Sequence, residues 1–160
     1  MIVHPIKPIY DDRSEILILG SFPSVKSREQ GFFYGHPQNR FWRVLSRVYE
    51  CKTPNTVEEK TVFLLDNHIA LWDVIKSCEI TGSADSSIKN VQINDISEIL
   101  NNSQVKRIFV NGKKAEALYK RYIEKDIKIK AVCLPSTSPA NATFSEDRLF
   151  EYWKNALKND

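Results

Sequence analysis

Residues 15–20 read EILILG, a short apolar run that ends in a glycine. Its isoleucine and leucine residues favour a strand buried on both faces, and the glycine favours a turn directly after it. Three further runs of this kind occur along the chain. We therefore expect strands over 15–19, 69–74, 105–110 and 128–134.

Helical patterns separate these runs. We expect helices over 39–50, 56–67, 94–102 and 112–123, and a last helix that begins near residue 145. Thr56 and Glu59 have the spacing of a capping box at the start of the second of these helices. Strands that alternate with helices predict crossover connections and a mostly parallel sheet. The expected fold is a single α/β domain over residues 1–160, a three-layer α/β/α sandwich around a four-stranded sheet.

Composition excludes several classes of protein. The chain has 160 residues, 42% of them hydrophobic and 27% charged, which is ordinary for a folded domain. No apolar run is long enough to span a membrane, and the first residues lack the apolar core of a signal peptide. Cys51, Cys78 and Cys133 are too far apart for a zinc, iron–sulfur or disulfide framework. We expect a cytoplasmic monomer with no membrane partner, no metal and no cofactor.

Ligands of such sheets bind beyond the carboxyl ends of the strands, so the segments that follow the strands are informative. Residues 20–24 read GSFPS, which has neither the dinucleotide fingerprint nor the Walker loop. Residues 31–42 read GFFYGHPQNRFW, where loop aromatics precede a basic helix start, as in sites that stack bases. Residues 134–142 read LPSTSPANA, a rigid polar loop whose N–H and hydroxyl groups suit phosphates.

Each segment also has a purely structural interpretation. GSFPS is compatible with an ordinary turn, the aromatics with a loop folded over the core, and LPSTSPANA with a simple connection. The net charge of +3 permits a nucleic-acid partner without requiring one. Residues 105–130 contain nine basic and three acidic residues, and Lys113 and Lys114 follow the third strand directly. Basic side chains at that edge fit a groove for a nucleic-acid backbone.

Taken in order, these segments resemble the uracil-DNA glycosylase superfamily. The resemblance is closest to its hypoxanthine-DNA (deoxyinosine) glycosylases and its mismatch-specific uracil/thymine branch. ILGSFPS is similar to the first motif of the superfamily, YGHPQNRFWRVL to a helix start of the mismatch branch, FVNGKKA to the third strand with its lysine turn, and LPSTSPANA to the second motif. The match runs from the first predicted strand to the last motif.

The resemblance implies a monofunctional DNA glycosylase that flips deaminated bases out of DNA and hydrolyses their N-glycosidic bond, which starts base excision repair. Hypoxanthine is the expected base, with uracil second. One departure is informative: the first motif carries a water-positioning Asn or Asp where this chain has Phe22. That points to the hypoxanthine-type enzymes and to Asn39 as the catalytic residue, with His36 and Asp85 as alternatives. A helix cap for Asn39, a loop cap for His36 and a solvated loop position for Asp85 are the structural interpretations.

The other site residues follow from the same motifs. Those expected to bind the base are Gly20, Ser21, Phe22 and Tyr34, where Tyr34 stacks on the base and the Ser21 or Phe22 N–H donates to a base carbonyl. Those expected to bind DNA are Ser24, Arg40, Lys113, Ser136, Thr137, Ser138, Pro139, Ala140 and Asn141. Ala140 stands where the mismatch branch has a leucine wedge, so Pro139 is a second candidate for that role.

Two other functions remain compatible with the sequence. One is mismatch-specific uracil excision. The other is a non-catalytic DNA- or nucleotide-binding module, in which Phe22 replaces the water-positioning residue and activity has been lost. Release of the base from DNA that contains inosine separates an enzyme from a binding module.

Overall fold

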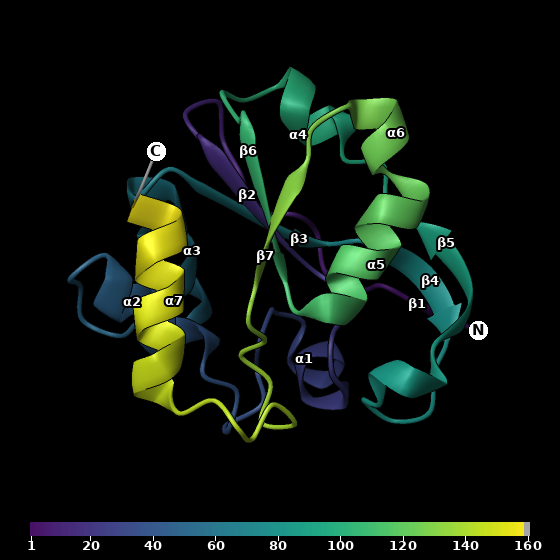
Figure 1. Cartoon of the computed structure of the whole chain (residues 1–160), viewed down its shortest axis with the longest axis horizontal. Helices are drawn as coiled ribbons and strands as arrows, with labels where there is room; N and C mark the ends of the chain where they lie inside the picture. Colours follow the sequence, from purple (N-terminus) through teal and green to yellow (C-terminus); the bar gives the residue numbers. More distant parts are fainter. Residues whose placement is uncertain (159–160) are drawn as a thin grey trace.

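Four parallel strands form the centre of the computed structural model, which describes residues 1–158 (Figure 1). They are β2 (Ile16–Gly20), β3 (Ile69–Asp73), β6 (Arg107–Asn111) and β7 (Ala131–Leu134), in the spatial order β3-β2-β6-β7. Gly20 pairs with Asp73, and Asn111 pairs with Leu134. The carboxyl ends of all four strands therefore meet at one edge of the sheet.

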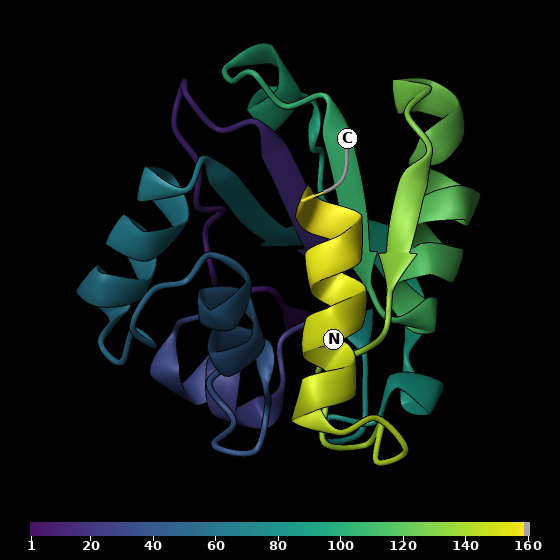
Figure 2. The same ribbon diagram turned by 60° about the vertical axis from the view of Figure 1, so that its left-hand side comes forward.

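Successive side chains of β2 enter two different cores, which is why the four residues 16–19 are all apolar. Ile16 and Ile18 pack on the side of α2 (Phe41–Val48), α3 (Val57–Asp66) and α7 (Glu146–Lys158). Leu17 and Leu19 pack on the side of α4 (Ser97–Asn101) and α5 (Lys113–Tyr122). Figures 1 and 2 show these helices on opposite faces of the sheet. The predicted three-layer α/β/α sandwich is confirmed.

A small antiparallel sheet extends the second layer. Its strands are β1 (Ile2–Val3), β4 (Ile75–Glu79) and β5 (Lys89–Ile93), in the order β1-β4-β5. β4 continues from β3 after a bend at Val74. The Asn94 amide holds this bend, because it donates to the carbonyl oxygens of Asp73 at 2.9 Å and Ile75 at 3.2 Å.

Three short elements complete the fold. Near the carboxyl edge lie α1 (Val25–Gln30) and the 3₁₀ turn η1 (Asp85–Ser87) in the β4–β5 connection, whereas α6 (Glu124–Ile127) follows α5 and leads into the start of β7 at the opposite edge (Figure 1). The predicted capping box is confirmed: the Glu59 N–H donates to the Thr56 hydroxyl at 3.0 Å, and the Glu59 carboxylate accepts from the Thr56 N–H.

The sequence predicted the four central strands and their parallel arrangement but did not predict the small sheet, α1 or α6. It also placed the start of the last strand too early, at residue 128. Lys128 has a left-handed backbone (φ 65°) and ends α6, since its N–H donates to the Glu124 carbonyl at 2.7 Å. Within residues 1–158, no helix has the length and apolar character to cross a membrane.

Candidate active site

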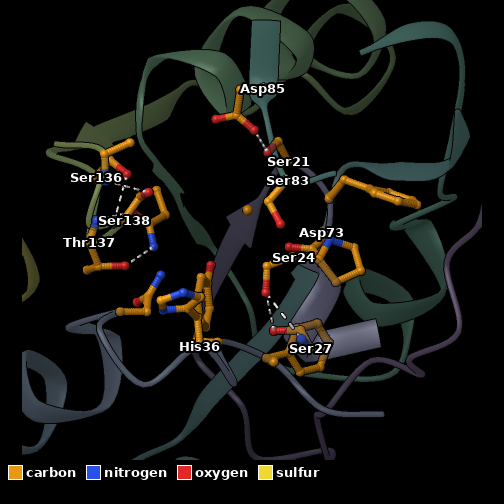
Figure 3. A pocket seen from close by; sticks show the side chains of 18 of the residues that line it. Ser21, Ser24, Ser27, His36, Asp73, Ser83, Asp85, Ser136, Thr137 and Ser138 are labelled. Carbon is orange, nitrogen blue, oxygen red and sulfur yellow. Dashed lines mark hydrogen bonds between the residues drawn. The ribbon is translucent and has the colours of Figure 1, made fainter. Parts of the chain in front are cut away.

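A cavity of about 320 Å³ lies at the carboxyl edge of the parallel sheet (Figure 3). Its walls come from the turn after β2, the loop before α2, the end of β3, the β4–β5 connection, the end of β6 and the loop after β7. The volume is within the range of small-molecule sites, about 300–1,000 Å³. The position is the one where open α/β sheets bind ligands.

Most of the predicted site residues line this cavity. They are Gly20, Ser21, Phe22, Ser24, Tyr34, His36, Asn39, Asp85, Ser136, Thr137, Ser138, Pro139 and Ala140. Arg40, Lys113 and Asn141 do not line it. Residues that the sequence did not single out also contribute, and they are Pro23, Ser27, Phe33, Asp73, Ser83 and Asn111.

The turn after β2 brings free backbone donors to the cavity. Among the described residues, neither the Ser21 N–H nor the Phe22 N–H has a hydrogen-bond acceptor. Ser24 ends the turn and caps α1, since its hydroxyl accepts from the Ser27 N–H at 3.2 Å. A ligand carbonyl is a natural acceptor for the two free N–H groups, because a bound ligand shields them from water and an unpaired donor is then costly.

Tyr34 forms an aromatic wall. Its ring stacks on Phe41 with a centroid distance of 4.0 Å and an interplanar angle of 13°, so the other face remains for a ligand. Its hydroxyl is buried and has no hydrogen-bond partner among the described residues. Burial raises the pKa of this phenol well above its usual value, and the nearby Asp73 charge adds to the shift. Tyr34 is therefore a neutral stacking surface.

Asn39 and His36 lie together in the loop before α2. The Asn39 side-chain oxygen accepts from the Phe41 N–H at 2.9 Å, so Asn39 caps the start of the helix and lines the cavity as well. The His36 Nδ1 accepts from the Gln38 N–H at 3.1 Å. An imidazole that accepts at Nδ1 carries its proton at Nε2, and His36 is therefore a potential hydrogen-bond donor. The Asn39 amide NH₂ has no acceptor among the described residues.

Asp85 reaches the cavity from η1. Its carboxylate accepts from the Ser21 hydroxyl at 3.3 Å, which joins the β4–β5 connection to the turn after β2. Partial burial raises the pKa of the Asp85 carboxyl, and the Asp73 charge adds to the rise, whereas the Ser21 hydroxyl and Lys114 oppose it. The structure thus brings Asp85 beside the predicted base-binding turn.

Asp73 is a second carboxylate at the cavity, and the sequence motifs did not single it out. Asp73 ends β3 beside Gly20 and lines the same cavity. Its Oδ2 lies 2.8 Å from the His4 Nε2, and the two side chains are only 5% and 2% exposed. The signal was present in the sequence, as an acidic residue at the end of a buried strand, but its partner is 69 positions away.

The loop after β7 is held by its own hydrogen bonds. The N–H groups of Thr137, Ser138 and Ala140 donate to Asn111, Ser136 and Ser138 side chains. The sequence suggested that these N–H groups bind phosphates, but they are already bonded within the protein. The Ser136 and Ser138 hydroxyls accept in these bonds and keep their own O–H as a donor, whereas the Thr137 side chain is fully buried.

Arg40 and Asn141 support this loop from within. The Arg40 guanidinium donates to the carbonyl oxygens of Ser138 at 2.8 Å and Asn141 at 3.2 Å, and also to that of Phe144. The Asn141 amide donates to the Ser136 carbonyl at 3.0 Å. The Arg40 guanidinium is thus turned inward, which argues against the expected contact with DNA phosphates.

The lysine pair at the start of α5 is divided between two surroundings. Lys113 is exposed and lowers the pKa of Cys133, which is otherwise raised mainly by burial. The charge of Lys114 lowers the pKa of the Asp85 carboxyl, which lines the cavity. Of the two lysines, Lys114 is therefore the one near the cavity, although the sequence favoured Lys113. Within residues 1–158, no group of three or more His, Cys, Asp or Glu side chains is placed to hold a metal ion.

Comparison with known proteins assigns the family. Residues 7–158 match the model of the uracil DNA glycosylase superfamily. The chain belongs to this superfamily. It is 36% identical to a Methanosarcina acetivorans protein named hypoxanthine DNA glycosylase, over 95% of this chain and 96% of that protein. A Methanosarcina barkeri protein of the same name is 37% identical over 68% of this chain and 70% of that protein.

A solved structure shares both the fold and the sequence. It is the solution NMR structure of a Methanosarcina acetivorans protein described as a uracil DNA glycosylase, with a TM-score of 0.83 and 36% identity over 98% of this chain and 96% of that one. Membership of the superfamily identifies the chain as a DNA glycosylase, a hydrolase of N-glycosyl bonds that acts on DNA.

The first motif of this glycosylase departs from the superfamily pattern at Phe22, and the structure shows what that side chain contacts. The Phe22 ring lies edge-on to the His4 imidazole, with centroids 5.8 Å apart. The Arg28 guanidinium lies over the Phe22 ring, 5.6 Å from its centroid. An apolar ring cannot orient water, so polar groups elsewhere in the cavity must do so.

Proposed function

We propose that this glycosylase removes deaminated bases from DNA, hypoxanthine first and uracil second, and that Asn39 is its catalytic residue. The observation that carries the proposal is that Tyr34, Asn39 and His36 line one cavity. The names of the two Methanosarcina relatives support the choice of hypoxanthine.

A base that leaves the DNA stack needs a surface to replace its lost neighbours. Tyr34 supplies one, since Phe41 backs one face of its ring and the hydroxyl is buried at the cavity wall. A bicyclic purine covers more of this ring than a pyrimidine does, which favours hypoxanthine over uracil. The free N–H groups of Ser21 and Phe22 are suited to a base carbonyl.

Hydrolysis breaks the bond between C1′ of the sugar and a base nitrogen, which leaves with the bonding electrons. The oxygen of a water molecule attaches to C1′; one water hydrogen stays on the new hydroxyl and the other proton ends on the released base. Asn39 cannot act as a strong base, but its amide can hold that water in position. His36 accepts from the Gln38 N–H at Nδ1 and so carries its proton at Nε2, which would donate a hydrogen bond to the departing base. Stabilisation of the negative charge on that base by hydrogen-bond donors held in place is the larger expected contribution.

Asn39 also caps α2, so the test must separate catalysis from helix capping. Asn39→Asp keeps an oxygen that accepts from the Phe41 N–H but loses the amide NH₂, whereas Asn39→Ala loses both. We expect the Ala variant to slow single-turnover release of hypoxanthine by about 100-fold or more, the scale of one positioned polar group. The Asp variant distinguishes a role of the NH₂ group from one of the side-chain oxygen.

Asn67→Ala is a matched control, because the Asn67 amide also makes a local bond at a helix end, to the Phe63 carbonyl at 2.8 Å, far from the cavity. It should match the wild-type rate. If Asn39→Ala folds and releases hypoxanthine at the wild-type rate, Asn39 has no catalytic role, and His36 and Asp85 become the candidates.

A further inference from the structure

Strand β7 forms one border of the parallel sheet. It pairs with β6 on one side, and among residues 1–158 no strand pairs with it on the other side. Helices α5 and α7 lie on the two faces of the sheet beside it (Figures 1 and 2). A border strand carries unpaired backbone groups with which another chain can pair.

The backbone groups of β7 that face outward can be identified. The Leu134 carbonyl accepts from the Gly112 N–H at 2.9 Å, so it points toward β6. Backbone N–H and C=O groups alternate in direction along a strand, so those of Val132 also face β6, whereas those of Ala131 and Cys133 face outward. Outside the β6–β7 ladder, the backbone groups of Ala131 and Cys133 have no partner among the described residues. Both residues therefore offer an N–H and a carbonyl oxygen to an added strand.

The side chains of β7 also suit a partner. Among the described side chains of the four parallel strands, Val132 is the one large apolar side chain that is exposed, at 46%. Cys133 is half-buried on the face that α5 covers. An extended segment that paired with β7 would remove the exposed valine from water.

Four exposed lysines surround this border, and we call them the lysine cluster. They are Lys113, Lys120, Lys128 and Lys130. The first two belong to α5, and their charges oppose the rise in the pKa of the Cys133 thiol that burial causes, which places them beside β7. The last two directly precede β7 in the chain. Residues 113–134 contain seven basic and three acidic residues, so the neighbouring carboxylates do not neutralise the cluster.

The charge of this border distinguishes between possible partners. A second copy of the chain would bring two lysine clusters together, which opposes the pairing of β7 with itself. A DNA backbone would attract the lysines, but it has no ladder of N–H and C=O groups to pair with β7. An extended peptide with acidic side chains satisfies both the lysines and the backbone groups.

We propose that the outer edge of β7 binds an extended acidic segment of a partner protein, which joins the parallel sheet as a further strand. The carbonyl oxygens and N–H groups of the segment pair with Ala131 and Cys133, its carboxylates pair with the lysine cluster, and its apolar side chains cover Val132. None of residues 131–134 lines the cavity. The proposed surface therefore does not depend on which base the enzyme removes.

The first test compares peptides on the wild-type protein. The probe is a fluorescein-labelled peptide of eight residues that alternates glutamate and valine, and its binding is followed by fluorescence anisotropy. Two further peptides carry N-methyl groups on the valine amides or on the glutamate amides. Only one of these two sets faces β7, and each lost hydrogen bond corresponds to roughly 2- to 10-fold in affinity.

We therefore expect one N-methylated peptide to bind at least about 5-fold more weakly than the unmodified peptide, because it loses two or more hydrogen bonds. The other N-methylated peptide should bind nearly as well as the unmodified one. Equal binding of all three peptides, or no binding of the unmodified peptide, would overturn the proposal.

Amide hydrogen exchange locates the bound peptide. In the protein alone, the amides of Ala131 and Cys133 should exchange faster than those of Val132 and Leu134, because only the latter pair with β6. The unmodified peptide should slow exchange at Ala131 and Cys133 and leave the amides of β5, another border strand, unchanged. Protection of Ala131 and Cys133 that instead rises with protein concentration alone would place a second copy at this border and overturn the proposal.

Charge reversal tests the lysine cluster. Lys128→Glu combined with Lys130→Glu should weaken binding of the acidic peptide by roughly 2- to 30-fold, the effect of two exposed ion pairs. Lys76→Glu combined with Lys89→Glu is the matched control, because both lysines are exposed on the small sheet. It should leave binding unchanged. Equal losses in the two double variants would show attraction to the net charge alone and contradict the proposal.

Cys133→Pro removes one N–H that faces outward and leaves the β6–β7 ladder intact. We expect it to weaken peptide binding by roughly 2- to 10-fold, whereas Cys133→Ser keeps the N–H and should match the wild type. A folded Cys133→Pro variant that binds the peptide as tightly as the wild type would contradict the proposal. If this variant does not fold, the N-methylated peptides and the exchange measurement on the wild-type protein still decide the question.

Discussion

Gly20→Ala is a small change that should disturb the candidate site strongly. A Cβ at position 20 would overlap with the Asp73 Oδ1 and lie 2.8 Å from the Tyr34 hydroxyl oxygen. The Tyr34 oxygen would have to move by about 0.6 Å to reach the shortest ordinary contact of 3.4 Å, and the Asp73 carboxylate further. Neither group moves easily, since Asp73 is held by His4 and Tyr34 is stacked on Phe41.

The expected effects follow from this displacement. Overpacking of a filled site costs about 1–3 kcal/mol of unfolding free energy. A displacement approaching 1 Å at a reaction site lowers the rate by up to about 100-fold. We therefore expect Gly20→Ala to lower both quantities, as measured by denaturant unfolding and by single-turnover release of hypoxanthine.

Gly31→Ala is the matched control. Gly31 has a positive φ of 72° and no atom within 4 Å of its Cβ position, so alanine there costs about 1 kcal/mol through backbone strain alone. It should lower stability and leave base release unchanged once the protein is folded. If Gly20→Ala has wild-type stability and wild-type release, the close approach of Asp73 and Tyr34 to Gly20 is wrong.

Three further predictions concern the same cavity. Phe22→Asn places a polar amide where the superfamily motif has its water-positioning residue, and it should raise uracil release relative to hypoxanthine release; an unchanged ratio of single-turnover rates would show that Phe22 does not set the choice of base. EDTA should leave base release unchanged, because no cluster of potential ligands within residues 1–158 is placed to hold a metal ion, and a loss that added zinc or magnesium restores would contradict this. Tyr34 should stay protonated at pH 10.0, the ordinary pKa of tyrosine, because burial and the Asp73 charge raise its pKa; in an ultraviolet titration, Tyr34→Phe should therefore not reduce the number of phenols that ionise by that pH, and a reduction would mean that the hydroxyl is hydrated.

The central sheet could be predicted because each of its strands carries the signal locally. In 16–19, every side chain is apolar because alternate residues enter two cores. The antiparallel hairpin of β4 and β5 was not predicted, because neither strand contains a long apolar run. The sequence of β4, IKSCE, mixes buried and exposed residues, and that of β5, KNVQI, mixes half-buried and exposed ones. The hairpin is stabilised by the pairing of β4 with β5 and by the pairing of β4 with β1. The second pairing joins parts of the chain that are distant in sequence.

The candidate site divides in the same way. Motifs at strand ends predicted most of the cavity wall, because the carboxyl ends of parallel strands meet at one edge. They did not predict the orientation of side chains, and Arg40 illustrates this: its place at a helix start suggested a contact with DNA, yet it binds carbonyl oxygens of the loop after β7. Asp73 was not singled out because its partner His4 lies 69 positions away and meets it only in the folded chain.

Direct detection of the released base tests the proposed function most directly. The wild-type protein, in excess over an oligonucleotide with one inosine, should produce free hypoxanthine and an abasic site in equal amounts, and an oligonucleotide with one uracil should react more slowly. A protein that binds the inosine oligonucleotide and leaves it intact would contradict the proposal and identify a binding module. Faster release of uracil than of hypoxanthine would keep the glycosylase activity but contradict the assignment of hypoxanthine as the preferred base.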